Sequence, residues 1–259
     1  MSRLIAVTGK GGVGKTTISA LLIKHLLEAG KSPVLAIDAD PNSCLDAALG
    51  VCVTDTVGRA REEVRAAVGA GGVGANISVS KREMLQLKLE AAMVEAKGFD
   101  LIAMGRPEGE GCYCYANNVL KDIIAEISSQ YPCVVLDNEA GLENLSRRII
   151  QKVDLMILVS DASNAGLQTL LRLYELAGEM NISYGKLALV INKLRGASLP
   201  EAARLPDRID EIRDKTRANI VIGLPVDDQV AEFAEASKSF LEIPSSNPVY
   251  ERVGELIVI

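Results

Sequence analysis

The stretch GKGGVGKT, residues 9–16, fits the phosphate-loop pattern G-x-x-x-x-G-K-[ST]. It directly follows the short apolar run LIAVT (4–8), which predicts a buried strand, and it opens a stretch of helical spacing that ends near Gly30. A strand, a glycine-rich loop and a helix in this order are the context that the pattern requires. The N-terminal part of the chain is therefore predicted to fold as a strand–loop–helix unit that binds phosphate.

Each type of residue in this loop has a physical use in holding a triphosphate. The glycines let successive backbone N–H groups curl around phosphate oxygens at the positive end of a helix. Lys15 reaches the β- and γ-phosphates, and the hydroxyl of Thr16 can ligate Mg²⁺. The predicted nucleotide contacts in the loop are Gly9, Lys10, Gly11, Gly12, Val13, Gly14, Lys15, Thr16 and Thr17.

A dinucleotide site is an alternative reading of the same stretch. The pattern G-x-G-x-x-G also begins at Gly9, and Asp38 lies near the distance expected of a ribose-binding acid. Lys15 followed by Thr16 favours a triphosphate, because a lysine with a magnesium-binding hydroxyl suits a triphosphate better than a pyrophosphate. The second match, GAGGVG at 69–74, follows a charged helical stretch and is interpreted as an ordinary loop.

The rest of the chain alternates apolar runs with helical segments. Further strands are predicted over 33–38, 100–104, 133–137, 155–160, 187–192 and 219–223. Further helices are predicted over 145–152, 164–180, 207–216 and 227–238. Hydrophobic residues make up 48% of the chain and aromatic residues only 3%, which is typical of parallel strands covered by helices. We expect an α/β fold with a doubly wound, mostly parallel sheet.

We expect residues 1–259 to form a single domain. The segment from about 53 to 98 interrupts the alternation, because two helical stretches occur there with no convincing strand between them. This segment is interpreted as a helical insertion into the domain.

The charge and hydropathy of the sequence indicate which partners and which cellular compartment to expect. The formal charge of −6 comes from 28 Lys plus Arg and 34 Asp plus Glu, dispersed along the chain, so neither a nucleic-acid partner nor an anionic membrane is expected. No stretch approaches the roughly 18 apolar residues of a membrane span, and no signal peptide is recognised. We expect a cytoplasmic protein, in which the five cysteines stay reduced.

Cys112 and Cys114 lie one residue apart in GCYCY (111–115). Side chains at i and i+2 project together from an extended chain but diverge on a helix, so the pair can hold one ion only outside a helix. A soft divalent ion generally takes four ligands, and the single histidine, His25, lies in the predicted first helix. A two-fold dimer would supply the missing two thiolates. From the residues alone, metal binding and packing are both open.

Lys10, which precedes Lys15 in the loop, is part of a pattern that resembles a known family. The sequence KGGVGKT at 10–16 resembles the hallmark of the deviant Walker A P-loop ATPases, the class of MinD, ParA and the nitrogenase iron protein. The resemblance implies ATP and Mg²⁺ as cofactors, hydrolysis to ADP and phosphate, and an ATP-dependent homodimer. It also implies that Lys10 crosses to the partner's nucleotide and stabilises transition-state charge. The alternative is a lysine on its own phosphates or in solvent.

Two further segments resemble the switches of that class. IDADP (37–41) resembles switch I, which implies that Asp38 supports Mg²⁺ and that Asp40 orients the attacking water. Extended spacing would turn both carboxylates to one side, and the alternative for Asp40 is a helix cap. DNEAGLE (137–143) resembles Walker B with switch II, which implies that Asp137 holds Mg²⁺ through water. Glu139 stands where the class usually has proline.

The adenine side carries weaker matches. Asn192 and Lys193, at the end of a predicted strand, resemble adenine-side elements of the class. So do Pro225 and Asp227 in GLPVDD (223–228). The alternative for Asp227 is a cap on the following helix.

Within the class, DADPNSCLDAALG (38–50) and the CYC stretch resemble the CooC group, the nickel-insertion ATPases that mature carbon monoxide dehydrogenase and acetyl-CoA synthase. The resemblance implies that Cys112 and Cys114 bind Ni²⁺ or Zn²⁺, shared across the dimer, and that one of those two enzymes is the client. The other cysteines are assigned to packing, although Cys44 lies beside switch I. They are Cys44, Cys52 and Cys133.

Two other functions fit the class. One is a MinD- or ParA-like positioning switch, but the C-terminal NPVYERVGELIVI has few cations and no Arg/Lys stripe marks a DNA face. The other is an electron-transfer ATPase with a bridging iron–sulfur cluster. In the iron protein the two cluster ligands lie far apart in sequence, whereas Cys112 and Cys114 are one residue apart.

Overall fold

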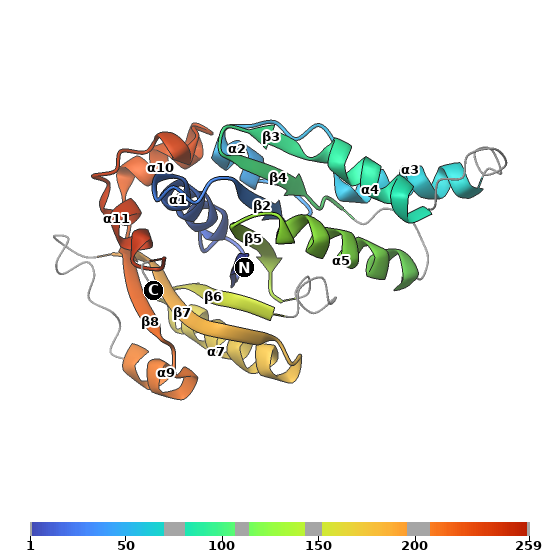
Figure 1. The fold of residues 1–259 in the computed structure, drawn as a ribbon. Coiled ribbons are helices and arrows are strands. Elements are labelled where there is room, and N and C mark those ends of the chain that lie inside the picture. The colour runs from blue at the N-terminus through green and yellow to red at the C-terminus, as the bar shows by residue number, and fades with distance from the viewer. Residues whose placement is uncertain (1, 70–80, 107–113, 143–151, 196–207, 258–259) are drawn as a thin grey trace.

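The computed structural model describes residues 2–69, 81–106, 114–142, 152–195 and 208–257. Within these ranges an eight-stranded sheet forms the middle layer, in the order β3-β4-β2-β5-β1-β6-β7-β8 (Figure 1). β1 (Arg3–Gly9) lies between β5 (Cys133–Ala140) and β6 (Lys152–Asp161), and both pair with it in parallel. The expected α/β fold with a doubly wound, mostly parallel sheet is confirmed.

The other strands extend the sheet on both sides of this centre. Their bounds are β2 (Val34–Asp38), β3 (Val94–Ala96), β4 (Phe99–Ala103), β7 (Ser183–Leu194) and β8 (Ile220–Pro225). Each strand predicted from an apolar run is present. The runs are apolar on both sides because both faces of the sheet are covered, as in β2, where every residue is buried.

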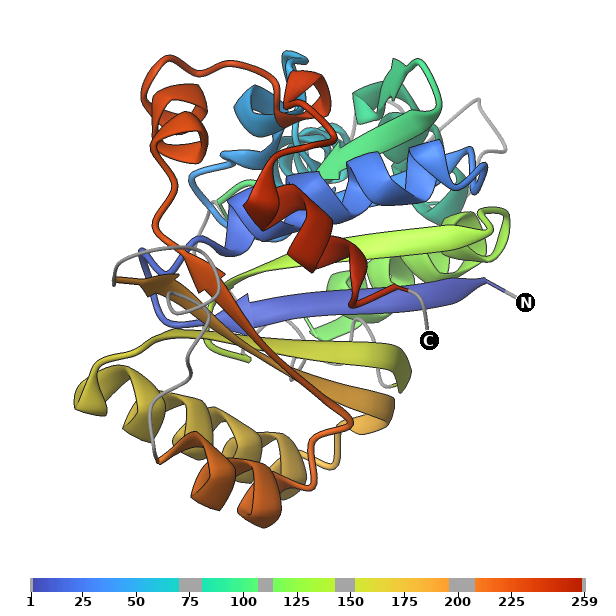
Figure 2. The same cartoon turned by 90° about the vertical axis from the view of Figure 1, so that its left-hand side faces the viewer.

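Helices cover the two faces separately. One face packs against α1 (Lys15–Glu28), α2 (Leu45–Leu49), α10 (Asp228–Glu235), the short 3₁₀ helix η1 (Phe240–Glu242) and α11 (Pro248–Gly254). The other packs against α3 (Val57–Gly69), α4 (Lys81–Ala92), α5 (Cys114–Ser129), α7 (Asn164–Glu179) and α9 (Ile209–Thr216). Figure 2 shows α1 and α11 on one side of the strands, and α7 and α9 on the other.

Helix α5 was not predicted, although its sequence carries the signal. Its buried residues Leu120, Ile123, Ile124 and Ile127 follow the i, i+3, i+4, i+7 spacing of a helix face. The short helices α2 and α11 were also missed. The helix predicted at 145–152 lies outside the described residues except for Lys152, which begins β6.

The segment at 53–98 differs from the prediction in one respect. Its helices are present as α3 and α4, but residues 94–96 form β3, which pairs antiparallel with β4 at the edge of the sheet. Three residues are too few to show an alternating pattern, so the strand is decided by pairing rather than by sequence. Of the loop interpreted at 69–74, only Gly69 is described, and it ends α3.

Helix α11 is fastened to the last turn of α1. The rings of His25 and Tyr250 stack with centroids 3.7 Å apart, and Nε2 of His25 donates to the carbonyl oxygen of Tyr250 at 2.5 Å. The hydroxyl of Tyr250 donates to Glu28, and Lys24 Nζ lies 5.0 Å from the centre of the tyrosine ring. Burial lowers the pKa of His25 below its usual 6.5, so the imidazole is neutral at neutral pH.

The neutral His25 predicts a loss of stability in acid. Because its pKa is lower in the folded chain than the usual 6.5, the unfolded chain takes up the proton first as the pH falls. The contribution of the neutral ring to the free energy of unfolding is therefore present above pH 6.5 and is lost below it. We expect the stability advantage of the wild type over His25→Gln to shrink between about pH 7.5 and about pH 5, measured by urea denaturation.

Glutamine is the matched replacement, because its amide can still donate to the Tyr250 carbonyl but does not titrate. Titration of other groups is common to both proteins and cancels in the comparison. A stability difference that stays constant across the pH range would contradict the prediction.

Candidate nucleotide site

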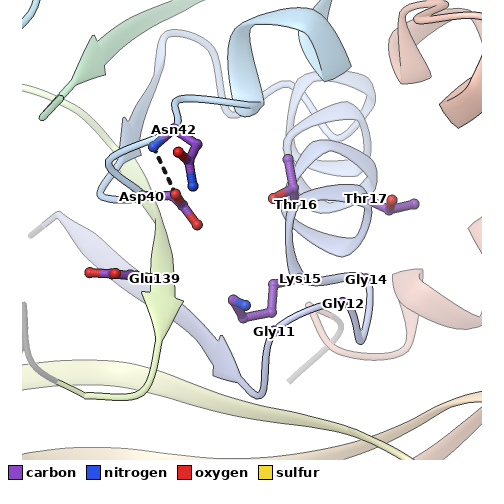
Figure 3. A pocket seen from close by; sticks show the side chains of 9 residues that line it. All are labelled: Gly11, Gly12, Gly14, Lys15, Thr16, Thr17, Asp40, Asn42 and Glu139. Carbon is purple, nitrogen blue, oxygen red and sulfur yellow. Dashed lines mark hydrogen bonds between the residues drawn. The ribbon is translucent and has the colours of Figure 1, made fainter. Parts of the chain in front are cut away.

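The phosphate loop joins β1 to α1 and borders a pocket of about 460 Å³ (Figure 3). β1 is also the strand from which the chain winds outward in both directions, to β2 and β4 on one side and to β6, β7 and β8 on the other. Ligands of open α/β sheets bind beyond the carboxyl ends of the strands at such a point. The lining residues are Gly11, Gly12, Gly14, Lys15, Thr16, Thr17, Asp40, Asn42 and Glu139.

The two lysines of the loop lie in different surroundings. Lys15 is only 8% exposed, its Nζ donates to the carbonyl oxygen of Lys10 at 3.2 Å, and Figure 3 shows it pointing into the pocket. Lys10 is exposed. The residue before α1 is Gly14, which has no side chain to cap the helix, so the first N–H groups of α1 are not capped by that residue.

Asp137, within β5, connects that strand to α1. It is 1% exposed and accepts hydrogen bonds from Thr16 Oγ1 at 2.7 Å and from Ser19 Oγ at 3.1 Å. Burial first, and then the charge of Asp38, raise its pKa to about 7, although the two hydrogen bonds act in the opposite direction. Sequence reasoning missed Ser19, although it stands three residues after Thr16 on the same face of a helix.

Asp38 is also buried, with an exposure of 1%. Its carboxylate accepts from the backbone N–H of Asp40 at 3.0 Å and of Leu45 at 2.9 Å, and burial raises its pKa to about 6. Leu45 is the first residue of α2, so the carboxylate at the start of that helix belongs to Asp38. The helix-cap alternative for Asp40 is therefore wrong.

Asp40 reaches the phosphate pocket instead. Its Oδ1 accepts from the backbone N–H of Asn42 at 2.8 Å, and both residues line the pocket (Figure 3). β2 ends at Asp38, so the extended spacing that would turn Asp38 and Asp40 to one side ends there too. Glu139 extends from β5, and its carboxylate points away from Lys15 in Figure 3.

The oxygen atoms around Asp137 fit Mg²⁺. Thr16, Asp38 and Asp137 offer a hydroxyl and carboxylates, the hard ligands that this ion prefers. Burial is the main reason why both carboxylates have raised pKa values, and a divalent cation would compensate their charge. The described part of the chain contains no group of three or more His, Cys, Asp or Glu side chains that could hold a metal ion. The proposed magnesium ligands are two aspartates and a threonine.

Asn192 and Lys193, near the end of β7, contact the backbone of the phosphate loop. Asn192 Nδ2 donates to the carbonyl oxygen of Val13 at 2.7 Å, and Lys193 Nζ donates to that of Gly12 at 2.8 Å. The pair thus holds the loop from β7, which is two strands away from β1 in the sheet.

Asp227 caps α10. Its Oδ1 accepts from the backbone N–H of Val230 at 2.8 Å and from Asn247 Nδ2 at 3.0 Å, which confirms the cap alternative for this residue. Pro225 ends β8, and the next residue, Val226, leaves an apolar side chain 51% exposed.

Only one of the three cysteines that were predicted to be packing residues is buried. Cys133 is buried, as expected of a packing residue, but Cys44 and Cys52 are exposed, so their assignment to packing is wrong. Partial burial and then the charge of Asp38 raise the pKa of Cys44. Cys114 is the first residue of α5, while its side chain and the whole of Cys112 lie outside the described residues.

Comparison with known proteins identifies the family. The model described as an AAA domain, AAA_31, matches residues 2–185. This chain belongs to the AAA_31 family of P-loop ATPases. An uncharacterized ATP-binding protein of Methanocaldococcus jannaschii is 42% identical over 98% of this chain and 96% of its own length. The carbon monoxide dehydrogenase accessory protein CooC of Rhodospirillum rubrum is 32% identical over 80% of each chain.

Solved structures show the same fold at low identity. A ParA family ATPase of Chlorobium tepidum superposes with a TM-score of 0.71 at 17% identity, covering 98% of this ATPase and 96% of that chain. MinD of Pyrococcus horikoshii, complexed with Mg-ADP, gives 0.66 at 20% identity, covering 99% and 94%. The ATPase therefore has the fold of the MinD/ParA class. Over the residues described, it has no helix long and apolar enough to cross a membrane.

Asn138 is a residue of this ATPase that sequence reasoning missed. It is 1% exposed, and within the described residues both Nδ2 and Oδ1 are buried without a hydrogen-bond partner. Side chains alternate along β5, so Asn138 faces the side opposite Asp137, the side of the hydrophobic cluster that contains Leu136. A buried amide without partners destabilises a fold by about 1–3 kcal/mol.

Replacing this amide by an apolar side chain of similar shape is predicted to stabilise the nucleotide-free ATPase. We expect Asn138→Leu to raise the free energy of unfolding by about 1–2 kcal/mol, because the unpaired polar atoms are removed without leaving a cavity. Urea denaturation measures the change, and Asn138→Ala, which does leave a cavity, is the comparison variant. A leucine variant less stable than the wild type would contradict the prediction.

Proposed function

We propose that this ATPase is a metallochaperone that hydrolyses ATP while delivering a soft divalent metal, nickel above all, to carbon monoxide dehydrogenase or acetyl-CoA synthase. The observation that carries the proposal is the similarity to the accessory protein CooC across most of both chains, in a sequence that contains a Cys-x-Cys pair. In the proposal, Cys112 and Cys114 of two copies hold one metal ion between them. The protein works in the cytoplasm as a single domain of residues 1–259.

The nucleotide roles follow the geometry of the loop. Lys15 binds the phosphates of its own copy, Asp40 orients the attacking water, and the exposed Lys10 reaches the nucleotide of the partner copy. The burial of Lys15 and the exposure of Lys10 support this division, because only an exposed side chain is free to cross an interface. Thr16, Asp38 and Asp137 hold Mg²⁺, which polarises the phosphate oxygens when bound.

In this proposal the nucleotide is also contacted by residues at the ends of β7 and β8. Asn192 and Lys193 contact it from the end of β7, where they already hold the loop backbone. Pro225 and Asp227 lie on the adenine side, and the exposed Val226 between them supports this by offering an apolar surface to a base.

The start of α5 supports the metal site. Cys114 is the first residue of this helix, and the positive end of a helix dipole favours the thiolate form of a cysteine, which is the form that binds metal. In the proposal, ATP and metal both bind the closed dimer better than the open one. Each then raises the affinity of the dimer for the other, as reciprocal coupling requires.

Metal content tests the shared thiolate site. We expect the anaerobically purified dimer to contain about one nickel or zinc ion per two chains, and the Cys112→Ser/Cys114→Ser variant to contain almost none, because two oxygens replace the soft ligands. Elemental analysis with and without ATP gives the numbers. Cys52→Ser, which changes an exposed cysteine outside the pair, is the control. Equal metal content in the double variant and the wild type would refute the site.

Light scattering tests the role of Lys10 across the dimer. In the presence of a non-hydrolysable ATP analogue, we expect Lys10→Ala to stay mostly monomeric and to lose at least about tenfold in kcat, because the trans-acting charge is gone. Lys31→Ala removes another exposed lysine, beyond the end of α1, and is expected to behave as wild type. An unchanged dimer fraction in Lys10→Ala would refute the clamp.

A MinD- or ParA-like positioning switch is the second candidate, favoured by the fold similarity to those proteins. The apolar face of helix α11 is not available to a membrane surface, because Val249, Tyr250 and Val253 are at most 3% exposed and pack in the core. ATP-dependent co-sedimentation with anionic vesicles or with DNA would favour the switch. For the iron–sulfur alternative, a colourless metal-loaded dimer would exclude a cluster.

A further inference from the structure

The tip of the switch I loop, residues 40–43, is shaped mainly by bonds to itself. The backbone N–H of Asn42 donates to Asp40 Oδ1 at 2.8 Å, and the N–H of Ser43 donates to the carbonyl oxygen of Asp40 at 3.0 Å. Ser43 has a left-handed φ of 46°. These bonds form a turn within residues 40–43, but none of them connects the turn to another part of the chain.

Arg106 supplies a contact from the segment that follows β4. Its guanidinium donates to Oδ1 of Asn42 at 3.3 Å, so the residue whose N–H binds Asp40 is held at its side chain by another part of the chain. Arg106 lies three residues after the end of β4, the strand that pairs with β2 and therefore runs beside the start of switch I. Hydrogen bonds thus connect Arg106 to Asn42 and Asn42 to Asp40, which lines the pocket beside the phosphate loop.

The backbone before Arg106 is fixed on both sides. The N–H of Met104 donates to the carbonyl oxygen of Asp38 at 2.8 Å, and the carbonyl oxygen of Met104 accepts from the N–H of Gly58 at 2.9 Å. Gly105 has a left-handed φ of 65°, which turns the chain toward switch I. Arg106 is thus presented from an anchored segment, and its planar guanidinium is a directional donor.

We propose that Arg106 is a positioning residue for ATP hydrolysis, which holds Asn42 and through it the Asp40 carboxylate in the orientation that the attacking water needs. The proposal rests on the role given to Asp40 in the proposed function. Both Arg106 and Asn42 are exposed, and an exposed bond of this kind contributes little to folding. Binding of ATP depends on the phosphate loop, so loss of the arginine should slow the chemical step more than it weakens binding.

Steady-state kinetics with the full chain test this role. We expect Arg106→Ala to lose about tenfold in kcat while KM for ATP changes by less than about twofold, because a misplaced catalytic group costs rate rather than ground-state binding. Arg106→Lys should recover part of the rate, since an ammonium group can also donate to Asn42. Arg59→Ala removes an exposed arginine on α3 that pairs with Glu63, and it is expected to match the wild type.

The double variant separates a positioning role from a structural one. If Arg106 acts through Asp40, then adding Arg106→Ala to Asp40→Asn should lower kcat no further. An unchanged kcat in Arg106→Ala, a raised KM with the same kcat, or a loss fully explained by a smaller folded fraction would each overturn the proposal. Full activity of Asp40→Asn would refute the role of Asp40 and this proposal together. An inactive Asp40→Asn beside a fully active Arg106→Ala would refute only the role of Arg106.

Discussion

The buried contact of Asp137 with Thr16 and Ser19 is the interaction on which the nucleotide site depends. It joins β5 to the first turns of α1, the helix that follows the phosphate loop. Without a partner, a carboxylate this deeply buried would be strongly destabilising, and the two hydroxyls reduce that cost. Burial still raises the pKa of Asp137 to about 7, so a positive charge placed beside it would stabilise the carboxylate form.

The strand order places everything else around that contact. β5 lies between β1 and β2, so the phosphate loop, the segment after β2 and the carboxyl end of β5 all lie at one edge of the sheet although they are far apart in sequence. Strands further from the centre add contacts of their own. β7 contacts the loop through Asn192 and Lys193, and the segment after β4 contacts Asn42 through Arg106. The pocket is thus supported from both sides of β1.

The predictable part of this arrangement is the part with strong local patterns. The phosphate loop, the apolar strands and α7 were predicted because each has a long run or a fixed motif that packing does not override. β3 was missed because three residues show no period, and the exposure of Cys44 and Cys52 was missed because residue type does not reveal which loops face solvent. The predicted pairing of Asp38 and Asp40 had assumed a strand that in fact ends at Asp38.

The sequence by itself determined the chemistry available at the site: a lysine and a threonine after a glycine-rich turn, aspartates at strand ends and a pair of nearby thiols. Only the tertiary structure decided which groups meet. Asp38 accepts a hydrogen bond from the first residue of α2, and Ser19 donates one to Asp137. Asp227 caps α10, and Asn138 has no hydrogen-bond partner within the described residues. The reason is physical, since such contacts join segments distant in sequence, and their partners are set by strand order and register rather than by local spacing.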